Sequence, residues 1–434
     1  MLIYTPIKTN RKAYIFKLLL SELYGVKIRI TNDIEEFKSC EEPKLNYSNQ
    51  KLGDEFFIQE RNFLNENDIR DQDIKVSEYN GIPVLFNTSH PYSDLPFDPF
   101  AASFYLVSRY EEYLPFIKDM YGRFAPDQSI AYQKGFLNKP VVNYWAGMLT
   151  GKLLEKYPEI RLKNRKFRFT PTIDVDSAYE YKNKGFIRAV GGCLRDALNL
   201  DFREVSERIS VIFGWKPDPF DTFDYQFLLQ KKYNLEPVYF ILFADYDEKD
   251  KNINIRNPKF INLVKFLADY AEVGIHPSFA SNDDFNKLRE EVKRLSVILN
   301  KEITSSRQHF LKLILPQTYR NLLNMGITDD YTMGYAGEPG FRAGICDSFP
   351  FYDLETEKET NLRIHPFCLM EGTLRDYKNI SAANAIQHIK PLIDEVKKVN
   401  GTLISLWHNE SLSDKKRWKG WTGVYEEMIN IVLS

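Results

Sequence analysis

The sequence predicts an α/β chain in which a distorted, seven-stranded (β/α) barrel follows a smaller mixed α/β N-terminal domain. Two observations predict this arrangement. After residue 165, short apolar runs alternate with helical patterns, which is typical of βα units on a parallel sheet. The part before residue 165 lacks this alternation, and its stretch 40–80 is polar and acid-rich. Because 434 residues exceed one ordinary domain, we predict two domains, at 1–165 and 166–434.

The predicted N-terminal domain begins with an amphipathic helix at 11–24. Two later segments, 97–116 and 141–158, have apolar residues at helical spacing, and the first of them is rich in aromatic side chains. We therefore expect a mixed domain held together by an aromatic core.

Seven apolar runs are predicted as the strands of the barrel: Phe167–Val175, Pro237–Ala244, Glu272–Ile275, Ile303–Gln308, Ile327–Tyr331, Leu362–Leu369 and Thr402–Trp407. Helix signals lie between several of these runs. Asn257 and Pro258 indicate a helix start with a capping side chain and a proline in the first turn, and Asn282 is predicted to cap another helix. Seven βα units favour an incomplete barrel over an open sheet.

The charge balance and composition exclude several classes of function. Lys and Arg (58) nearly match Asp and Glu (60), so the net charge of -2 gives no indication of binding to nucleic acid or to an anionic membrane. No run approaches the roughly 20 apolar residues of a membrane helix, and the first 25 residues lack the continuous apolar core and cleavage site of a signal peptide. We expect a cytoplasmic protein without a membrane span, whose ligand is small or neutral.

Two carboxylates, Asp174 and Asp176, end the first barrel strand in FTPTIDVDSAY. In parallel α/β barrels the catalytic residues collect at the strand ends. Side chains two apart on a strand point to the same face, with about 6.6 Å between their Cα atoms. One carboxylate can then bind a metal while the other takes a proton from a water molecule that the metal activates. The alternative is a pair that caps the next helix or faces solvent.

Two other predicted strands end in residues with nitrogen donors. His276, in EVGIHPSFASN, is a candidate metal ligand. In SSRQHFLKL, Arg307 and His309 lie two apart on one face, so Arg307 can orient Asp174 while His309 supplies another nitrogen to the metal. The alternatives are a core histidine that is already hydrogen-bonded, for His276, and a surface salt bridge, for Arg307.

His408 ends the last predicted strand in LISLWHNES. An imidazole opposite the base can protonate a leaving amine, which is the second half of an acid–base pair. The alternative is a core histidine with one backbone partner. His365 lies inside its predicted strand, and we expect it to be structural.

Together these residues resemble the polysaccharide deacetylases of carbohydrate esterase family four, over about residues 165–434. TIDVD is similar to a spaced form of the family's TFDDG motif, which implies that Asp174 is the base and Asp176 a metal ligand. HPSFA is similar to half of the HSxxH motif, because it has His276 but Ala280 in place of the second histidine. His309 or water can replace the missing ligand, or the site binds its metal weakly.

Two further motifs and one loop complete the resemblance. SSRQHF implies that Arg307 orients the base, and LWHNE implies that His408 is the general acid. The loop DDYTMGYAGEPGFRAG implies substrate contacts by Tyr335 and Arg342, and Trp407 beside the acid is a further candidate for substrate binding. The resemblance implies a divalent metal, zinc first, and removal of an N-acetyl or other N-acyl group from an amino sugar. It implies nothing about the function of the N-terminal domain.

Two other functions stay open. A non-catalytic carbohydrate-binding descendant of the barrel fits the lost second histidine, and it need hold no metal. A DxD motif also occurs in metal-dependent glycosyltransferases, but their nucleotide-binding half precedes the motif, and residues before 165 show no alternating βα pattern. We rank the deacetylase first, because the positions of the base, the arginine and the acid are all filled.

Overall fold

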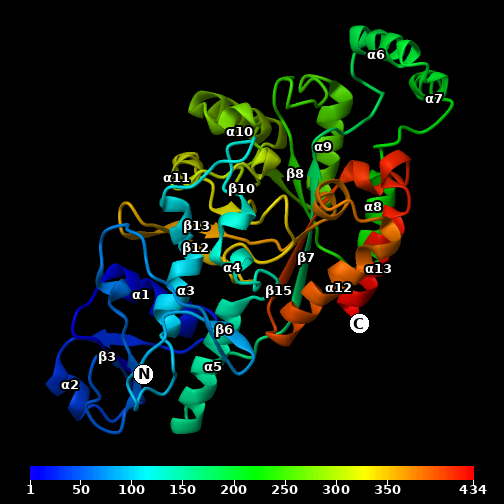
Figure 1. The fold of residues 1–434 in the computed structure, drawn as a ribbon. Helices are drawn as coiled ribbons and strands as arrows, with labels where there is room; N and C mark the ends of the chain where they lie inside the picture. Colours follow the sequence, from blue (N-terminus) through cyan, green and yellow to red (C-terminus); the bar gives the residue numbers. More distant parts are fainter.

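The computed structural model describes residues 1–434 and arranges the strands in three sheets (Figure 1). A four-stranded parallel sheet near the N-terminus has the order β2-β1-β3-β4, and β5 pairs antiparallel with β6. The third sheet has nine strands in the order β12-β13-β11-β10-β9-β8-β7-β15-β14. The strands are β1 (Leu2–Tyr4), β2 (Arg29–Thr31), β3 (Lys44–Ser48), β4 (Phe56–Gln59), β5 (Ser77–Tyr79), β6 (Ile82–Val84), β7 (Arg168–Val175), β8 (Val238–Ile241), β9 (Glu272–Ile275), β10 (Ser305–Ser306), β11 (Asp329–Asp330), β12 (Phe349–Asp353), β13 (Lys358–Ile364), β14 (Leu369–Met370) and β15 (Thr402–His408).

Thirteen α-helices connect and cover these sheets. None of them combines the length and the apolar composition that crossing a bilayer requires. The helices are α1 (Asn10–Phe16), α2 (Ile34–Ser39), α3 (Pro99–Val107), α4 (Ile130–Gln133), α5 (Val141–Lys156), α6 (Phe186–Leu198), α7 (Phe202–Ile212), α8 (Phe223–Tyr233), α9 (Pro258–Tyr270), α10 (Phe285–Leu299), α11 (Gln317–Asn324), α12 (Ala382–Lys398) and α13 (Trp421–Leu433).

The nine-stranded sheet contains the seven predicted strands, but the predicted distorted seven-stranded barrel is not confirmed, because the sheet has nine strands. Its neighbours are parallel except at β12–β13, and the end strands β12 and β14 are not paired with each other. The predicted run Leu362–Leu369 is divided between two strands, because Pro366 has no backbone N–H to donate to a ladder. β13 and β14 therefore lie toward opposite ends of the strand order. The antiparallel strand β12 was not predicted. The α/β class with a large, mostly parallel sheet is confirmed.

The predicted helix starts agree with the structure at one position and differ at another. Asn257 caps α9, and its side chain accepts a hydrogen bond from the N–H of Lys259. Asn282 does not cap α10, because Asp284 takes that position and accepts from two N–H groups of the first turn. Asn282 instead donates to the carbonyl of Lys312 at 2.7 Å. Both residue types are good caps, so the tertiary contact of Asn282 decides between them.

The N-terminal region and the large sheet share one hydrophobic core. The largest cluster, 71 buried residues, has members on both sides of residue 165. The hydroxyl of Tyr14 in α1 donates to the carbonyl of Pro350 in β12 at 2.8 Å, and its ring packs 5.0 Å from that of Tyr352. The predicted domain boundary at 165 falls in the connection between α5 and β7, and it remains a prediction because the core crosses it.

The parallel strands bring their carboxyl ends to one edge of the sheet. β7 lies between β8 and β15, with Asp174 opposite His408 in β15. β9 and β10 continue the sheet on the other side of β8, where Ile275 lies opposite Ser306. The residues that end or directly follow these strands therefore meet at this edge.

Candidate active site

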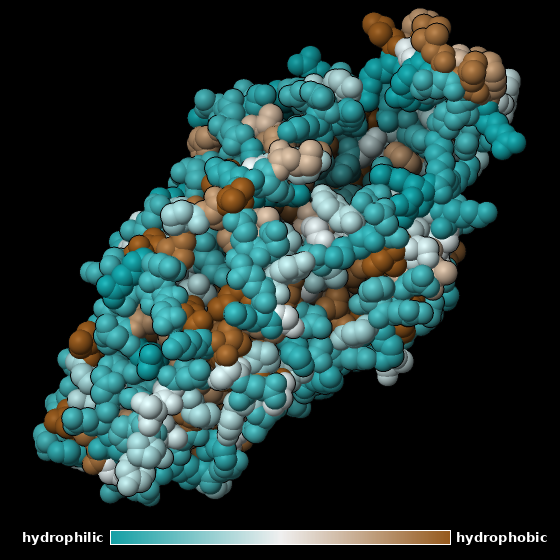
Figure 2. Space-filling model, viewed as in Figure 1, coloured by the Kyte–Doolittle hydropathy of each residue, from teal (hydrophilic) through white to brown (hydrophobic).

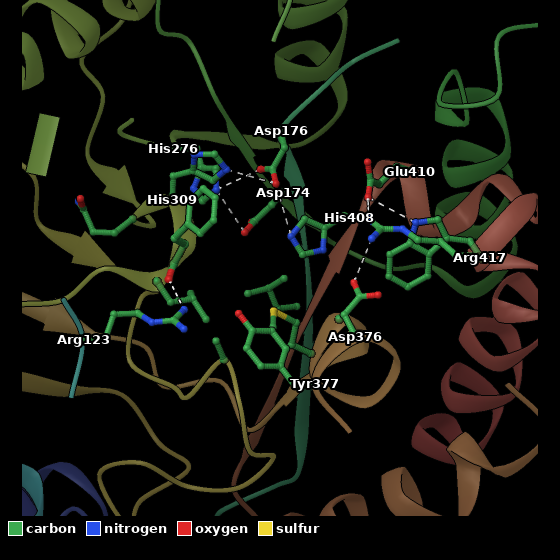
Figure 3. A pocket seen from close by; sticks show the side chains of 18 residues that line it. Arg123, Asp174, Asp176, His276, His309, Asp376, Tyr377, His408, Glu410 and Arg417 are labelled. Atoms are coloured by element: carbon green, nitrogen blue, oxygen red, sulfur yellow. Dashed lines mark hydrogen bonds and ion pairs between the residues drawn. The ribbon is translucent and has the colours of Figure 1, made fainter. Parts of the chain in front are cut away.

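Five predicted site residues line one pocket at the carboxyl edge of the sheet (Figure 3). They are Asp174, Asp176, His276, His309 and His408. A sixth, Arg307, lies behind Asp174 and has no solvent exposure.

Asp176, His276 and His309 have the geometry of a site for a divalent cation. Their ligand atoms all lie within 4.8 Å of one another. Nε2 of His276 lies 3.2 Å from Oδ1 of Asp176, and Nε2 of His309 lies 3.5 Å from Oδ2. Oδ1 of Asp176 is buried without a hydrogen-bond partner, which is costly unless a cation or a proton lies beside it. One carboxylate and two imidazoles are a ligand set that zinc accepts, so these three residues fit a zinc ion.

The outer nitrogens of both histidines are held by the protein. Nδ1 of His276 is hydrogen-bonded to the carbonyl of Arg307, and Nδ1 of His309 to Oδ1 of Asp250 at 2.8 Å. Since each Nδ1 faces an oxygen, it carries the proton in the neutral ring, and Nε2 of the neutral ring then has a lone pair toward Asp176. Asp250 was not identified from the sequence, because it lies in a polar loop 59 residues from its partner.

Negative charge dominates around these ligands. Burial by itself would raise the pKa of Asp176, but His309 and His276 hold this pKa well below its ordinary value. Burial would likewise lower the pKa of His309, and the carboxylates of Asp176 and Asp250 raise it to about 9. The cluster therefore attracts a positive charge.

Arg307 holds Asp174 in place. Its Nη1 donates to Oδ1 of Asp174 at 2.8 Å, and its Nε donates to the carbonyl of Tyr331 at 3.0 Å. The guanidinium also lies 4.6 Å from the ring centre of Phe240. The other carboxylate oxygen, Oδ2, lies 3.7 Å from Nε2 of His276. The pairing expected from the sequence is thus present, and it is a buried pair rather than a surface salt bridge.

His408 faces the same pocket from β15, and Glu371 fixes its ring. Glu371 has no solvent exposure and accepts from both the backbone N–H and Nδ1 of His408, each at 2.8 Å. Burial would lower the pKa of His408, but Glu371, followed by Asp176, raises it well above the ordinary value. Glu371 was missed because it directly follows β14, which the sequence did not separate from β13. A strand break at Pro366 would have revealed it as one more strand-end acid.

Loops and the N-terminal region form the rest of the pocket wall. Arg123 belongs to the N-terminal region, and its Nη1 donates to the carbonyl of Phe310 at 2.7 Å. No sequence signal pointed to this contribution, because it depends on contacts between segments far apart in the chain. The further lining residues are Gln308, Phe310, Leu311, Ala336, Met370, Gly372, Asp376, Tyr377, Leu406, Glu410, Arg417 and Trp418.

The structure does not bring the three predicted substrate-binding residues to the pocket. Neighbours on a strand point to opposite faces, so Trp407 points away from the side that His408 faces and packs on Tyr425, with 4.8 Å between ring centres. Arg342 and Tyr335 are buried against the N-terminal region. These three predictions are therefore corrected: the side chains are parts of the core and of a buried polar network.

That network is centred on Glu112. Its carboxylate accepts from Nε and Nη2 of Arg342 at 2.9 and 2.7 Å and from Nε of Arg109 at 2.8 Å. Nη2 of Arg109 also donates to the hydroxyl of Tyr335 at 3.1 Å. All four side chains are buried, so the network joins the N-terminal region to the loop after β11 through fully desolvated groups.

Glu112→Ala is expected to lower the free energy of unfolding by about 3–5 kcal/mol, because the buried guanidinium of Arg342 loses its counter-charge and that of Arg109 keeps only Glu111, 3.6 Å away. Thermal and urea unfolding monitored by circular dichroism measure this loss. Glu155→Ala is the matched control: it removes an exposed pair with Lys152 in α5 and is expected to change the stability by less than about 1 kcal/mol. Equal effects of the two variants would contradict the importance of the network.

The fold and the cluster together define an α/β protein with a candidate metal centre. Residues 1–158 match the sequence profile of a family of unknown function, DUF7033. No curated protein matches the chain.

Several solved structures are similar to the chain at low identity. One assigned as a polysaccharide deacetylase from Mycobacterium smegmatis has 12% identity and a TM-score of 0.39, and the match covers 62% of this chain and 85% of that one. A second structure, also assigned as a polysaccharide deacetylase, comes from Pseudomonas aeruginosa. It has 12% identity and a TM-score of 0.39, and the match covers 61% of this chain and 84% of that one. A pseudoenzyme of carbohydrate esterase family four from Bacillus anthracis has 12% identity and a TM-score of 0.29, and the match covers 61% of each chain. At these TM-scores the similarities carry no conclusion about function.

Proposed function

We propose that this protein is a metal-dependent hydrolase that removes an N-acetyl or other N-acyl group from an amino sugar. One observation carries the proposal: a three-ligand cluster (Asp176, His276 and His309) lies between a carboxylate, Asp174, and an imidazole, His408, in one pocket. A base and an acid on either side of a cation site suit amide hydrolysis. The pocket wall combines Tyr377 and Trp418 with charged side chains, which suits a sugar.

The steps of hydrolysis follow from these side chains. A divalent cation held by the cluster would polarise the acyl carbonyl and make a water molecule more acidic. Asp174, oriented by Arg307, takes a proton from the water as its oxygen bonds to the carbonyl carbon. His408, positioned by Glu371, gives its proton to the amide nitrogen as the C–N bond breaks. The products are a carboxylate, acetate in the simplest case, and a free amine. In this proposal residues 1–165 form a domain that shapes the pocket through Arg123.

The experiment is a screen for acetate release. Purified protein is loaded with zinc and incubated with N-acetylglucosamine oligomers, and acetate and free amine are quantified with and without a chelator. The proposal expects equal amounts of both products, loss of activity on chelation and recovery when zinc is restored. A protein that binds the oligomers, holds no metal and releases no acetate would instead be a binding protein, the alternative that Ala280 in place of a second histidine favours.

Glu371→Gln is expected to lower kcat by about 10- to 100-fold, because His408 loses its orienting carboxylate. The pH profile distinguishes this role from a structural one. His408 must be protonated to act as the acid, so activity is lost as the pH rises through its pKa. Removing the carboxylate lowers that pKa, and the alkaline limb of the profile should move to lower pH. Asp376→Asn, another acid of the pocket wall without contact to His408, should leave the limb unchanged.

A further inference from the structure

Helices α6 and α7 form a hairpin that projects from the body of the molecule, at the upper right of Figure 1. The segment is inserted between β7 and α8. Polar contacts tie it to the body: Lys416 lies 2.7 Å from Glu204, and Lys415 lies 2.8 Å from Glu207. The two helices are joined to each other by an ion pair at 2.6 Å, between Arg208 and Asp196. The hairpin therefore owes little of its position to apolar packing.

The hairpin exposes its apolar side chains. Of the 23 large apolar side chains exposed in the whole chain, eleven lie between residues 186 and 215. Figure 2 shows brown side chains gathered at this projecting end of the molecule. A concentration of this kind marks an interaction surface, because soluble proteins rarely leave extended apolar patches in water. The residues are Phe186, Ile187, Val190, Leu194, Leu198, Leu200, Phe202, Ile209, Ile212, Phe213 and Trp215.

The apolar residues follow the period of each helix. In α6, Phe186, Val190, Leu194 and Leu198 recur every four residues, so they share one face. Beyond α7, the rings of Phe213 and Trp215 stack with 5.4 Å between their centres, and Trp215 is followed by Lys216. Amphipathic helices with an aromatic and cationic edge are typical of segments that lie in the interface of a bilayer.

The charge of the hairpin favours an anionic partner. Residues 182–216 contain seven Lys and Arg and four Asp and Glu, a formal charge of +3, whereas the whole chain has -2. The acids at 196, 204 and 207 are engaged in the ion pairs described above. Lys182, Arg188, Arg203 and Lys216 have no acidic partner within 4.0 Å. Their positive charge is therefore free to attract a surface of opposite sign.

We propose that the α6–α7 hairpin docks this protein on an anionic lipid surface. The outward apolar side chains enter the boundary between headgroups and acyl chains, and the unpaired cations contact the anionic headgroups. A second copy of the chain is a poorer partner, because a symmetric contact between two hairpins brings two positively charged surfaces together. The hairpin follows β7 in the chain, and α6 begins ten residues after Asp176.

Vesicle binding tests the proposal without any need for catalytic activity, so its failure leaves the proposed hydrolase unaffected. The full-length protein is sedimented with vesicles of phosphatidylcholine alone and with vesicles that also contain phosphatidylglycerol. The double variant Ile187→Glu/Leu198→Glu changes side chains that are 86% and 83% exposed, so the fold should be retained. Ile117→Glu, at an 81% exposed position outside the hairpin, is the matched control. A third variant, Arg203→Glu/Lys216→Glu, reverses two of the unpaired charges.

Binding to the phosphatidylglycerol vesicles is expected, with weaker binding to phosphatidylcholine alone and at high salt. The hairpin double variant should bind at least about tenfold more weakly, because two buried aliphatic contacts are lost. The charge-reversal variant should lose at least about fivefold in vesicle affinity for each reversed position. The Ile117 control should bind as the unchanged protein does. Equal binding by the hairpin variant and the control, or no binding to either vesicle, would overturn the proposal. A dimer that only the hairpin variant dissociates, without vesicle binding, would assign the surface to self-association.

Discussion

Replacing Asp176, His276 or His309 by alanine is expected to remove bound metal from the purified protein. Each side chain supplies one of three ligand atoms that lie within 4.8 Å of one another. Loss of an outer partner of a metal ligand commonly costs about 10- to 100-fold in affinity, and loss of a ligand itself should cost at least the upper end of that range. Elemental analysis after reconstitution with zinc and dialysis, together with zinc titration by calorimetry, measures this effect.

His365→Ala is the matched control for the metal measurement. His365 is an imidazole paired with a carboxylate, Asp329, at 2.7 Å, but it lies outside the cluster. The His365 variant should keep a full equivalent of zinc, and circular dichroism should show that all four variants are folded. Full zinc in the His309 variant would mean that another group, such as water, completes the site.

Asp174→Asn is expected to lower kcat for acetate release by about 10²- to 10⁴-fold while zinc content stays unchanged. The amide keeps the shape of the carboxylate and still accepts a hydrogen bond from Arg307, but it cannot take the proton of the attacking water. Single-turnover rates of acetate release, measured on the zinc-loaded protein, give the size of the effect. The combination of retained zinc and lost turnover separates a base from a ligand.

Asp376→Asn again serves as the control, because Asp376 lines the same pocket and its nearest ionic partner is Arg417 at 3.4 Å. Its kcat should stay within a few-fold of the unchanged protein. An Asp174 variant with nearly full activity would assign the base to another group. Loss of zinc from that variant would instead make Asp174 part of the metal site.

The strands of the large sheet could be predicted where a short segment rich in apolar residues marks the strand. β7, β8, β9 and β15 have this property, and each matches a predicted strand within a few residues. β12 and β14 were not predicted as separate strands, because β12 is defined by its antiparallel pairing with β13, and the predicted run Leu362–Leu369 was not divided at Pro366. The open order of nine strands depends on these pairings between distant segments, which periodicity in the sequence does not report.

By itself, the sequence determined which side chains meet at the edge of the sheet: Asp174, Asp176, His276, His309 and His408. It could do so because parallel strands end at one edge, so residues at or just after the strand ends meet there. Only the tertiary structure decided what surrounds them. Glu371 and Asp250 hold two of the imidazoles, Arg123 reaches the pocket from the N-terminal region, and the predicted substrate residues are buried elsewhere. Each of these outcomes depends on contacts between segments far apart in the chain, and such contacts leave no local pattern in the sequence.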